Sequence, residues 1–224
     1  MLSIFGRAPV SKVTAPLGRA LNKTGLTPNS VTLIGTVVTV AAALTLFPAG
    51  YLFWGTVFVL FDMLDGAMAR ARGGGTKYGA VLDATCDRVA DGAIFAGLAW
   101  WAVYTEGDKP LLIATLICLV TSQVISYAKA RAEASGLSAD GGWIERPDRL
   151  VIVLLGAGLT GIGRHFDIAW LDSVIYPAMW ILAALSVVTV FQRVLAVRRS
   201  DGAREIIRTT GESPTGESDG EVSS

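Results

Sequence analysis

Six long apolar runs, separated by short polar connections, dominate the hydropathy pattern of this chain. About 18 residues of helix rise ~27 Å, which nearly matches the ~30 Å hydrocarbon core of a bilayer. The fifth run is short, so its helix must begin near Pro147 to cross. The pattern predicts an all-α integral membrane protein with six transmembrane helices. The runs cover approximately residues 30–47, 51–71, 79–104, 111–134, 150–163 and 173–197.

The ends of the chain have a different character from the apolar runs. Residues 1–24 alternate basic and apolar positions, which is typical of an amphipathic juxtamembrane helix on the membrane surface, although a plain linker remains an alternative. No long apolar core precedes a cleavage site there, so we expect no cleaved signal peptide. We expect residues 25–199 to form the membrane domain, with Asn29 or Ser30 capping its first helix and Pro48 helping to stop it. Residues 200–224 are polar and predict a disordered tail.

Composition agrees with a membrane protein, and the basic residues indicate its orientation. The chain is 52% hydrophobic and its formal net charge is zero; its mean hydropathy is +0.51. If both termini are cytoplasmic, 17 of the 19 Lys and Arg residues lie on the inner side, and only Lys109 and Arg164 lie outside. This asymmetry predicts a multi-pass protein of the cell membrane with its N- and C-termini in the cytoplasm.

Four carboxylates interrupt the apolar sequence on either side of the second polar connection. Asp62 and Asp65 are spaced i,i+3, and Asp83 and Asp87 are spaced i,i+4, so each pair shares one face of a helix. In the predicted topology both pairs lie in the cytoplasmic half of the membrane, at the same depth. An intramembrane carboxylate costs roughly 2.5–3.5 kcal/mol and indicates function. We therefore predict that the four converge on a divalent cation.

Oxygen ligands at a cytoplasmic face favour Mg²⁺ or Mn²⁺, ions that commonly neutralise a phosphate or pyrophosphate during transfer. Gly66 and Gly79 stand near these carboxylates, where the lack of a side chain allows a ligand to approach the backbone. Tight helix packing is the alternative explanation for such glycines. In this acidic setting, we favour ligand approach.

A cationic cluster is predicted on the same side of the membrane. Arginine binds phosphate oxygens in a bidentate manner and lysine adds a point charge, so these residues could line a phosphate pocket. The alternative is the ordinary enrichment of basic residues in cytoplasmic segments, and we assign Arg198, Arg199, Arg204 and Arg208 to it. His165 falls on the opposite side and is expected to be a bystander. The cluster comprises Lys129, Arg131, Arg146, Arg149 and Arg193.

The acidic motif resembles the signature of the CDP-alcohol phosphatidyltransferases. Eight positions match at fixed spacing, from Asp62 to Asp87, and the predicted six-span layout is similar along nearly the whole membrane portion. The resemblance implies two Mg²⁺ ions, with Mn²⁺ as an alternative, bound to the pyrophosphate of a CDP-linked lipid, and CMP as the leaving group. It also implies a homodimer. The matching residues are Asp62, Asp65, Gly66, Ala69, Arg70, Gly79, Asp83 and Asp87.

The same resemblance implies a role for each residue of the motif. The metal ligands would be Asp62, Asp65, Asp83 and Asp87, and Asp87 would also act as the general base on the acceptor hydroxyl. The substrate would be CDP-diacylglycerol, attacked at the phosphorus attached to the lipid. Its binding site would contain Pro28, Asn29, Thr32, Gly66, Arg70 and Gly79.

The segments around residues 126–133 and 145–149 are similar to those of the actinobacterial phosphatidylinositol-phosphate synthases within this family. That resemblance implies inositol phosphate (1D-myo-inositol 3-phosphate) as the acceptor and phosphatidylinositol phosphate as the product. The residues themselves support only a phosphorylated polar acceptor, so a phosphatidylglycerophosphate synthase using glycerol 3-phosphate is the alternative. The implied acceptor pocket comprises Ser126, Lys129, Arg149 and Arg193, with Arg131 and Arg146.

Two other classes of protein fit the pattern less well. A divalent-cation transporter would place acidic residues through the full depth of the membrane, whereas the outer halves of the predicted spans contain almost none. Nothing in a purely structural scaffold favours four carboxylates in apolar sequence. Membrane lipid is an expected partner and nucleic acid is not. Ala93, Gly97 and Ala99 suit either a dimer interface or packing within the bundle.

Overall fold

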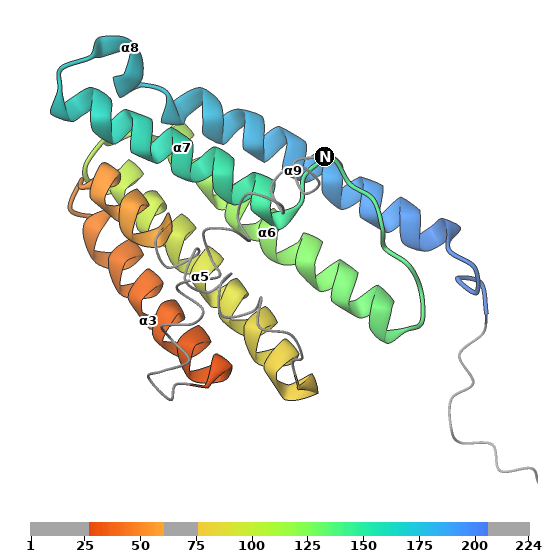
Figure 1. Cartoon of the computed structure of the whole chain (residues 1–224). Helices are drawn as coiled ribbons and strands as arrows, with labels where there is room; N and C mark the ends of the chain where they lie inside the picture. The colour runs from red at the N-terminus through yellow and green to blue at the C-terminus, as the bar shows by residue number, and fades with distance from the viewer. Residues whose placement is uncertain (1–26, 61–75, 206–224) are drawn as a thin grey trace, which may run out of the picture.

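The computed structural model describes residues 27–60 and 76–205, and it contains no β-strand among them. A helical stretch at residues 52–60 reaches the edge of the described chain. The prediction of an all-helical protein is therefore confirmed for these residues. In chain order, the other helices are α3 (Pro28–Leu46), α5 (Lys77–Tyr104), α6 (Lys109–Ala134), α7 (Arg146–His165), α8 (Ala169–Asp172) and α9 (Ile175–Arg199) (Figure 1).

The N-cap of the first described helix lies two or three residues before the predicted cap. The prediction of Asn29 or Ser30 as the N-cap is wrong, because Thr27 holds that position in extended backbone and its side chain accepts a hydrogen bond from the Ser30 amide at 3.2 Å. Pro28 stands in the first turn. Proline suits this place because its φ is already helical and its missing N–H has no intrahelical partner there anyway.

Helices α5, α6 and α7 also have side-chain caps at their N-termini. Thr76 caps α5 by accepting from the Gly79 amide at 2.9 Å, and Asp108 caps α6 by accepting from the Leu111 amide at 2.7 Å. Helix α7 begins at Arg146 behind a capping box formed by Glu145 and Asp148, which confirms that the fifth helix starts near Pro147. The predicted loop at residues 164–172 contains the short helix α8.

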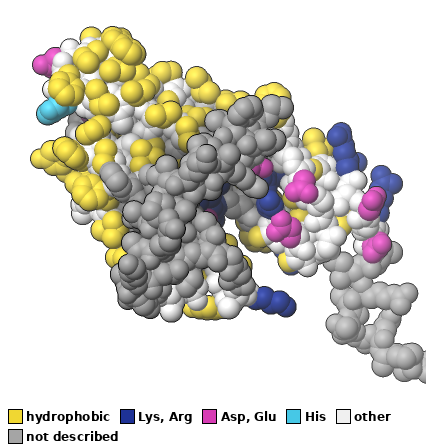
Figure 2. Space-filling model, in the orientation of Figure 1, with side chains coloured by type: hydrophobic (Ala, Val, Ile, Leu, Met, Phe, Trp, Pro, Cys, Tyr) yellow, Lys and Arg dark blue, Asp and Glu magenta, His cyan; other side chains and the backbone are white. Residues whose placement is uncertain are grey.

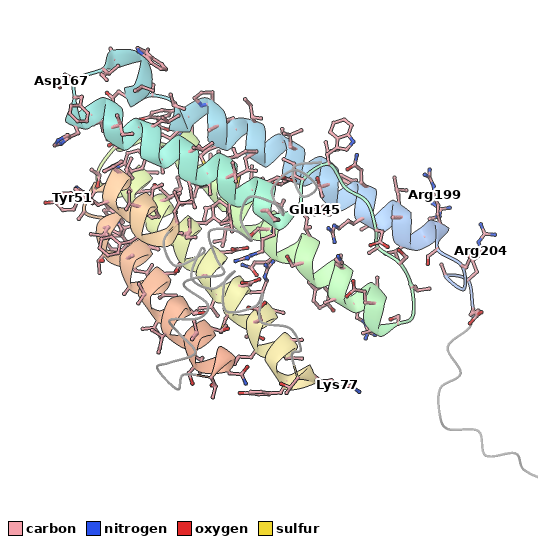
Figure 3. The ribbon with its side chains drawn as sticks, in the orientation of Figure 1. Tyr51, Lys77, Glu145, Asp167, Arg199 and Arg204 are labelled. Carbon is pink, nitrogen blue, oxygen red and sulfur yellow. The ribbon has the colours of Figure 1, made fainter. Side chains whose placement is uncertain are left out.

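The helices form a bundle in which α5, α6 and α9 each pack against two other helices. Helix α5 packs against α3 and α6, α6 packs against α9, and α7 packs against α8 and α9. Two ends of the bundle can be distinguished in Figure 3, with Tyr51 and Asp167 at one and Lys77, Arg199 and Arg204 at the other. We call the second the charged end. Helices α3, α5 and α7 start towards it, and α6 and α9 finish there. Figure 2 shows Lys, Arg, Asp and Glu side chains gathered towards the end of α6 and α9.

Three described helical segments are long and apolar enough to cross a membrane. They are Asn29–Leu46, Lys109–Ala134 and Ala169–Arg199. Helices α5 and α7, with 28 and 20 residues, reach ~42 Å and ~30 Å but carry more charge. The end of the predicted second span, from residue 61, lies outside the described residues. The described chain is therefore that of a helical membrane protein with three candidate spans.

Close contact between α3 and α5 depends on small residues. A Cβ at Gly97 would lie 2.2 Å from the backbone oxygen of Ala43, so only glycine allows this approach. Ala93 and Gly97 are buried within the bundle, and so is Ala99. Of the two roles predicted for these residues, packing within the bundle is therefore observed. The hydrophobic core of the bundle includes Phe47, Phe95, Leu98, Trp101, Leu154 and Met179.

A polar cluster joins the helices at the end opposite the charged end. The guanidinium of Arg164 donates to Glu106 through both terminal nitrogens and to Asp172 through Nε at 2.6 Å. Tyr176 donates to the same Glu106 carboxylate at 3.3 Å. Arg164 also lies over the Trp101 ring, 4.9 Å from its centroid. The cluster thus connects the end of α5, the end of α7, α8 and the start of α9.

The predicted juxtamembrane helix at residues 1–24 lies outside the described residues. The same holds for most of the predicted disordered tail, from residue 206. Residues 200–205 are described and form turns after α9.

Candidate functional site

Asp83 and Asp87 line one cavity between α3, α5 and α7. The two aspartates stand one turn apart on α5, and Thr32 of α3 lines the same cavity, which has a volume of about 70 Å³. We call it the carboxylate cavity. Four of the predicted ligands and contacts, Asp62, Asp65, Gly66 and Arg70, lie outside the described residues.

The start of α3 lies close to the start of α5. A Cβ at Gly79 would lie 3.0 Å from Oδ1 of Asn29 and 3.2 Å from the Thr76 hydroxyl. Glycine thus leaves room for the Asn29 side chain beside the first turn of α5. Asn29, Thr32 and Gly79, three of the predicted CDP-lipid contacts, therefore lie on neighbouring helices at the charged end, and Pro28 is in the first turn of α3.

The donor set of the carboxylate cavity fits a divalent cation with oxygen ligands. Asp83 and Asp87 supply two carboxylates on the same face of α5. Within residues 27–60 and 76–205 there is no group of three or more His, Cys, Asp or Glu side chains placed to hold a metal. A complete metal site would therefore need ligands beyond those described.

A second, larger pocket lies on the other side of α5, lined by α5, α6, α7 and α9. We call it the cationic pocket, and its volume is about 790 Å³. Both Asp87 and Arg146 line this pocket and the carboxylate cavity. Asp87 therefore lines both cavities. Five of the six predicted acceptor-phosphate residues line the cationic pocket: Ser126, Lys129, Arg146, Arg149 and Arg193.

The sixth predicted residue, Arg131, does not line the cationic pocket and is exposed. It follows Lys129 by two positions on α6. Two helical residues are separated by about 200° around the axis, so residues i and i+2 do not face the same side. The prediction of Arg131 as an acceptor contact is therefore not supported by its position.

Two arginines of the cationic pocket are buried with unused donors. Arg149 is 2% exposed and Arg193 is 6% exposed. Nη1 and Nη2 of Arg149, together with Nε and Nη1 of Arg193, have no hydrogen-bond partner within the described part of the chain. A buried donor without a partner costs about 1–3 kcal/mol, and more when charged. Such a cost is typical of a site that is satisfied by a bound anion.

Arg146 connects the pocket to the carboxylates of α5. Its Nη1 lies 3.1 Å from Oδ2 of Asp87, while its Nη2 and Nε lie 3.1 Å and 3.3 Å from Oδ1 of Asp91. The guanidinium therefore bridges two carboxylates one turn apart. Because Arg146 also begins α7, this bridge sets the start of α7 against the middle of α5.

Two residues were not identified as site residues from the sequence: Arg88, which lines the cationic pocket, and Asp91, which contacts its arginines. Arg88 donates to Ser126 Oγ and lies 3.4 Å from Asp91 Oδ2. Asp91 is 1% exposed. A signal was available, because Asp91 follows Asp87 by four positions and so lies on the same face of the helix.

The site combines carboxylates that fit a divalent cation with a neighbouring pocket of buried arginines. It lies in a bundle of membrane-length helices. This combination is that of a membrane enzyme acting on phosphate groups. Comparison with known proteins identifies the family. The family model of the CDP-alcohol phosphatidyltransferases matches residues 25–191, and the chain belongs to this family. It is therefore an enzyme of the CDP-alcohol phosphatidyltransferase type.

Several relatives are similar over nearly the full chain. The phosphatidylinositol phosphate synthase of Mycobacteroides abscessus is 59% identical over 211 residues, covering 92% of this chain and 93% of its own. That of Mycolicibacterium smegmatis is 60% identical over 216 residues, covering 94% and 96%.

Solved structures of the Mycobacterium tuberculosis phosphatidylinositol phosphate synthase are similar to this fold. The structure with CDP-DAG bound has a TM-score of 0.79 and 56% identity, covering 88% of this chain and 100% of that one. The complex with manganese and citrate has the same TM-score and identity, covering 90% and 96%.

Proposed function

We propose that the chain transfers the phosphatidyl group from CDP-diacylglycerol to inositol phosphate, 1D-myo-inositol 3-phosphate. The products are phosphatidylinositol phosphate and CMP. The observation that carries the proposal is the pair of buried arginines, Arg149 and Arg193, whose donors are unused in the described chain, in a pocket that also contains Asp87. The names of the relatives support the same acceptor.

The transfer has a simple balance of bonds. An oxygen of the acceptor hydroxyl forms a bond to the lipid-attached phosphorus of CDP-diacylglycerol. The bond between that phosphorus and the oxygen bridging to CMP breaks, and CMP leaves with the electron pair. The hydroxyl proton passes to Asp87, which acts as the general base. Asp87 suits this role because it lines both the carboxylate cavity and the cationic pocket.

The CDP moiety would bind on the α3 side of Asp87. Pro28, Asn29, Thr32 and Gly79 stand at the charged end of α3 and α5, and Gly66 and Arg70 would complete this site. Asp83 and Asp87, with Asp62 and Asp65, would hold the divalent cations, two Mg²⁺ or Mn²⁺ ions. A metal in this place neutralises the pyrophosphate charge that grows as CMP leaves. The manganese complex of the Mycobacterium tuberculosis relative supports this assignment.

The acceptor phosphate would bind on the α6 side of Asp87. Arg149 and Arg193 offer buried guanidinium donors, and Lys129 contributes a half-exposed ammonium that pairs with Glu133 at 3.8 Å. Ser126 adds a hydroxyl. Charge-assisted hydrogen bonds of this kind are about twice as strong as neutral ones. Free inositol, which carries no phosphate, would leave these donors unsatisfied.

The topology proposed with this function is six spans, with both termini and the site in the cytoplasm. The three apolar helical segments and the grouping of basic residues at the charged end support this arrangement. We also propose that the enzyme is a homodimer in the cell membrane.

An acceptor competition tests the function. Purified protein in detergent receives CDP-diacylglycerol and Mg²⁺ with inositol 3-phosphate, free inositol or glycerol 3-phosphate, and CMP release is followed. We expect release with inositol 3-phosphate only. Release with glycerol 3-phosphate alone would overturn the acceptor assignment and identify a phosphatidylglycerophosphate synthase. Release with free inositol would refute the role of the buried arginines.

A further inference from the structure

Asp91 is a buried carboxylate surrounded by arginines from two helices. Its side chain is 2% exposed. Oδ1 accepts from Nη2 and Nε of Arg146 at 3.1 Å and 3.3 Å. Oδ2 lies 3.4 Å from Arg88 Nη2 and 3.9 Å from Arg149 Nη2. Each oxygen is thus committed to guanidinium groups, and these three arginines all line the cationic pocket.

The charges at this point do not balance. One carboxylate faces three guanidinium groups, and Arg146 has a second carboxylate, Asp87, at 3.1 Å. Arg193, also buried, adds a further positive charge to the pocket. Asp91 therefore leaves the pocket cationic. Its geometric effect is larger, because it connects α5 to the first turn of α7, where it binds Arg146 and lies 3.9 Å from Nη2 of Arg149.

We infer that Asp91 is a positioning residue that sets the guanidinium groups of Arg146 and Arg149 for the phosphate of the acceptor. The inference rests on the proposed function, in which the cationic pocket receives a phosphorylated acceptor. Asp91 does not line the cationic pocket, so it acts through the arginines and not on the acceptor itself. Together with Asp87 it holds Arg146 between two carboxylates, and it lies 3.9 Å from Nη2 of Arg149, so the guanidinium groups meet the phosphate without reorganisation.

A purely electrostatic role would have the opposite consequence. Removing a negative charge next to an anion site strengthens the attraction for phosphate, so the acceptor KM would fall. Removing a positioning carboxylate frees the guanidinium groups to repel one another and move apart, so the acceptor KM would rise. The sign of the change therefore separates the two roles.

The test is Asp91→Asn, which keeps the size of the side chain and removes its charge. The rate of CMP release is first measured at varied inositol 3-phosphate and saturating CDP-diacylglycerol. It is then measured at varied CDP-diacylglycerol and saturating inositol 3-phosphate, with Mg²⁺ present throughout. We expect the acceptor KM to rise about tenfold, the loss of about one charged hydrogen bond, while the KM for CDP-diacylglycerol stays within twofold. An unchanged or lower acceptor KM, or an equal rise in both, would overturn the inference.

Glu133→Gln provides a matched control. This carboxylate also lines the cationic pocket and pairs with Lys129, but its side chain is 60% exposed. Loss of its charge should leave the acceptor KM equal or lower. A rise like that of Asp91→Asn would show that any lost carboxylate has this effect, and would refute positioning.

A second variant keeps the inference testable if Asp91→Asn does not fold. Asp91→Glu keeps the charge and displaces it by one methylene, and we expect the acceptor KM to rise above the wild-type value, with the KM for CDP-diacylglycerol unchanged. An equal rise in the two KM values would contradict the inference. If the wild type uses glycerol 3-phosphate instead, the proposed function fails, and the same ratio of KM values measured with that acceptor still decides the role of Asp91.

Discussion

Replacing Arg193 by alanine should weaken the binding of the acceptor while leaving the fold intact. Arg193 is 6% exposed in the cationic pocket, and Nε and Nη1 have no hydrogen-bond partner within the described residues. A hydrogen bond to a charged group contributes about 1.5–3 kcal/mol. If the acceptor phosphate satisfies one such donor, its loss raises the acceptor KM about 10- to 150-fold, since about 1.4 kcal/mol corresponds to a factor of ten.

The same variant should not lose thermal stability. The wild-type protein buries a guanidinium whose Nε and Nη1 have no hydrogen-bond partner among the described residues, and such burial is itself destabilising. Alanine removes that cost along with the packing of the aliphatic stem, so we expect the Tm in detergent to stay equal or rise. Kinetics of CMP release and thermal unfolding, measured on the same preparation, test both halves of the prediction.

Arg198→Ala is the matched control for Arg193→Ala. Both arginines belong to α9, but Arg198 is exposed and does not line the cationic pocket. Its loss should change the acceptor KM by less than a factor of two. Equal effects of the two variants, or an equal rise in the KM for CDP-diacylglycerol, would refute the acceptor-phosphate role of Arg193.

Three further variants address the base, the helix contact and the polar cluster. Asp87→Asn should abolish CMP release while CDP-diacylglycerol binding stays measurable by calorimetry; normal turnover would contradict the base assignment. Gly97→Ala should lower stability by about 1–3 kcal/mol, because its Cβ would meet the Ala43 oxygen at 2.2 Å, whereas Gly92→Ala, whose Cβ would lie 3.8 Å from Nε2 of Gln123, should not. Arg164→Gln should lower the Tm by removing charged hydrogen bonds at the end away from the site, with the acceptor KM unchanged; a selective rise in that KM would disprove the separation.

The helices were predictable because each apolar run is long and ends in polar sequence. The predicted run at 79–104 corresponds to Lys77–Tyr104 in the structure, and the run at 111–134 to Lys109–Ala134. Helix starts were less predictable. Thr27, Asn29 and Ser30 all have side chains that can cap a helix, and the preference of Pro28 for the first turn decided between them.

The site was only partly predictable from the chain. The spacing of Asp83 and Asp87 on one helix determines that they face the same cavity. The partners of Asp91 are a tertiary property, because Arg146 and Arg149 come from a helix more than 50 residues later and no local pattern pairs them with it. The position of Arg131 outside the cationic pocket was predictable in principle, because residues two apart on a helix face different sides, and Arg131 follows Lys129 by two.

The position of Asp87 between the carboxylate cavity and the cationic pocket has a consequence for the order of chemical events. The carboxylate cavity lies between α3, α5 and α7, and the cationic pocket is lined by α5, α6, α7 and α9, so on the proposed function the donor and the acceptor bind on different sides of Asp87. Both substrates can be present when the phosphorus–oxygen bond breaks. The phosphatidyl group can then pass directly from one alcohol to the other, without a covalent lipid–enzyme intermediate, through a ternary complex.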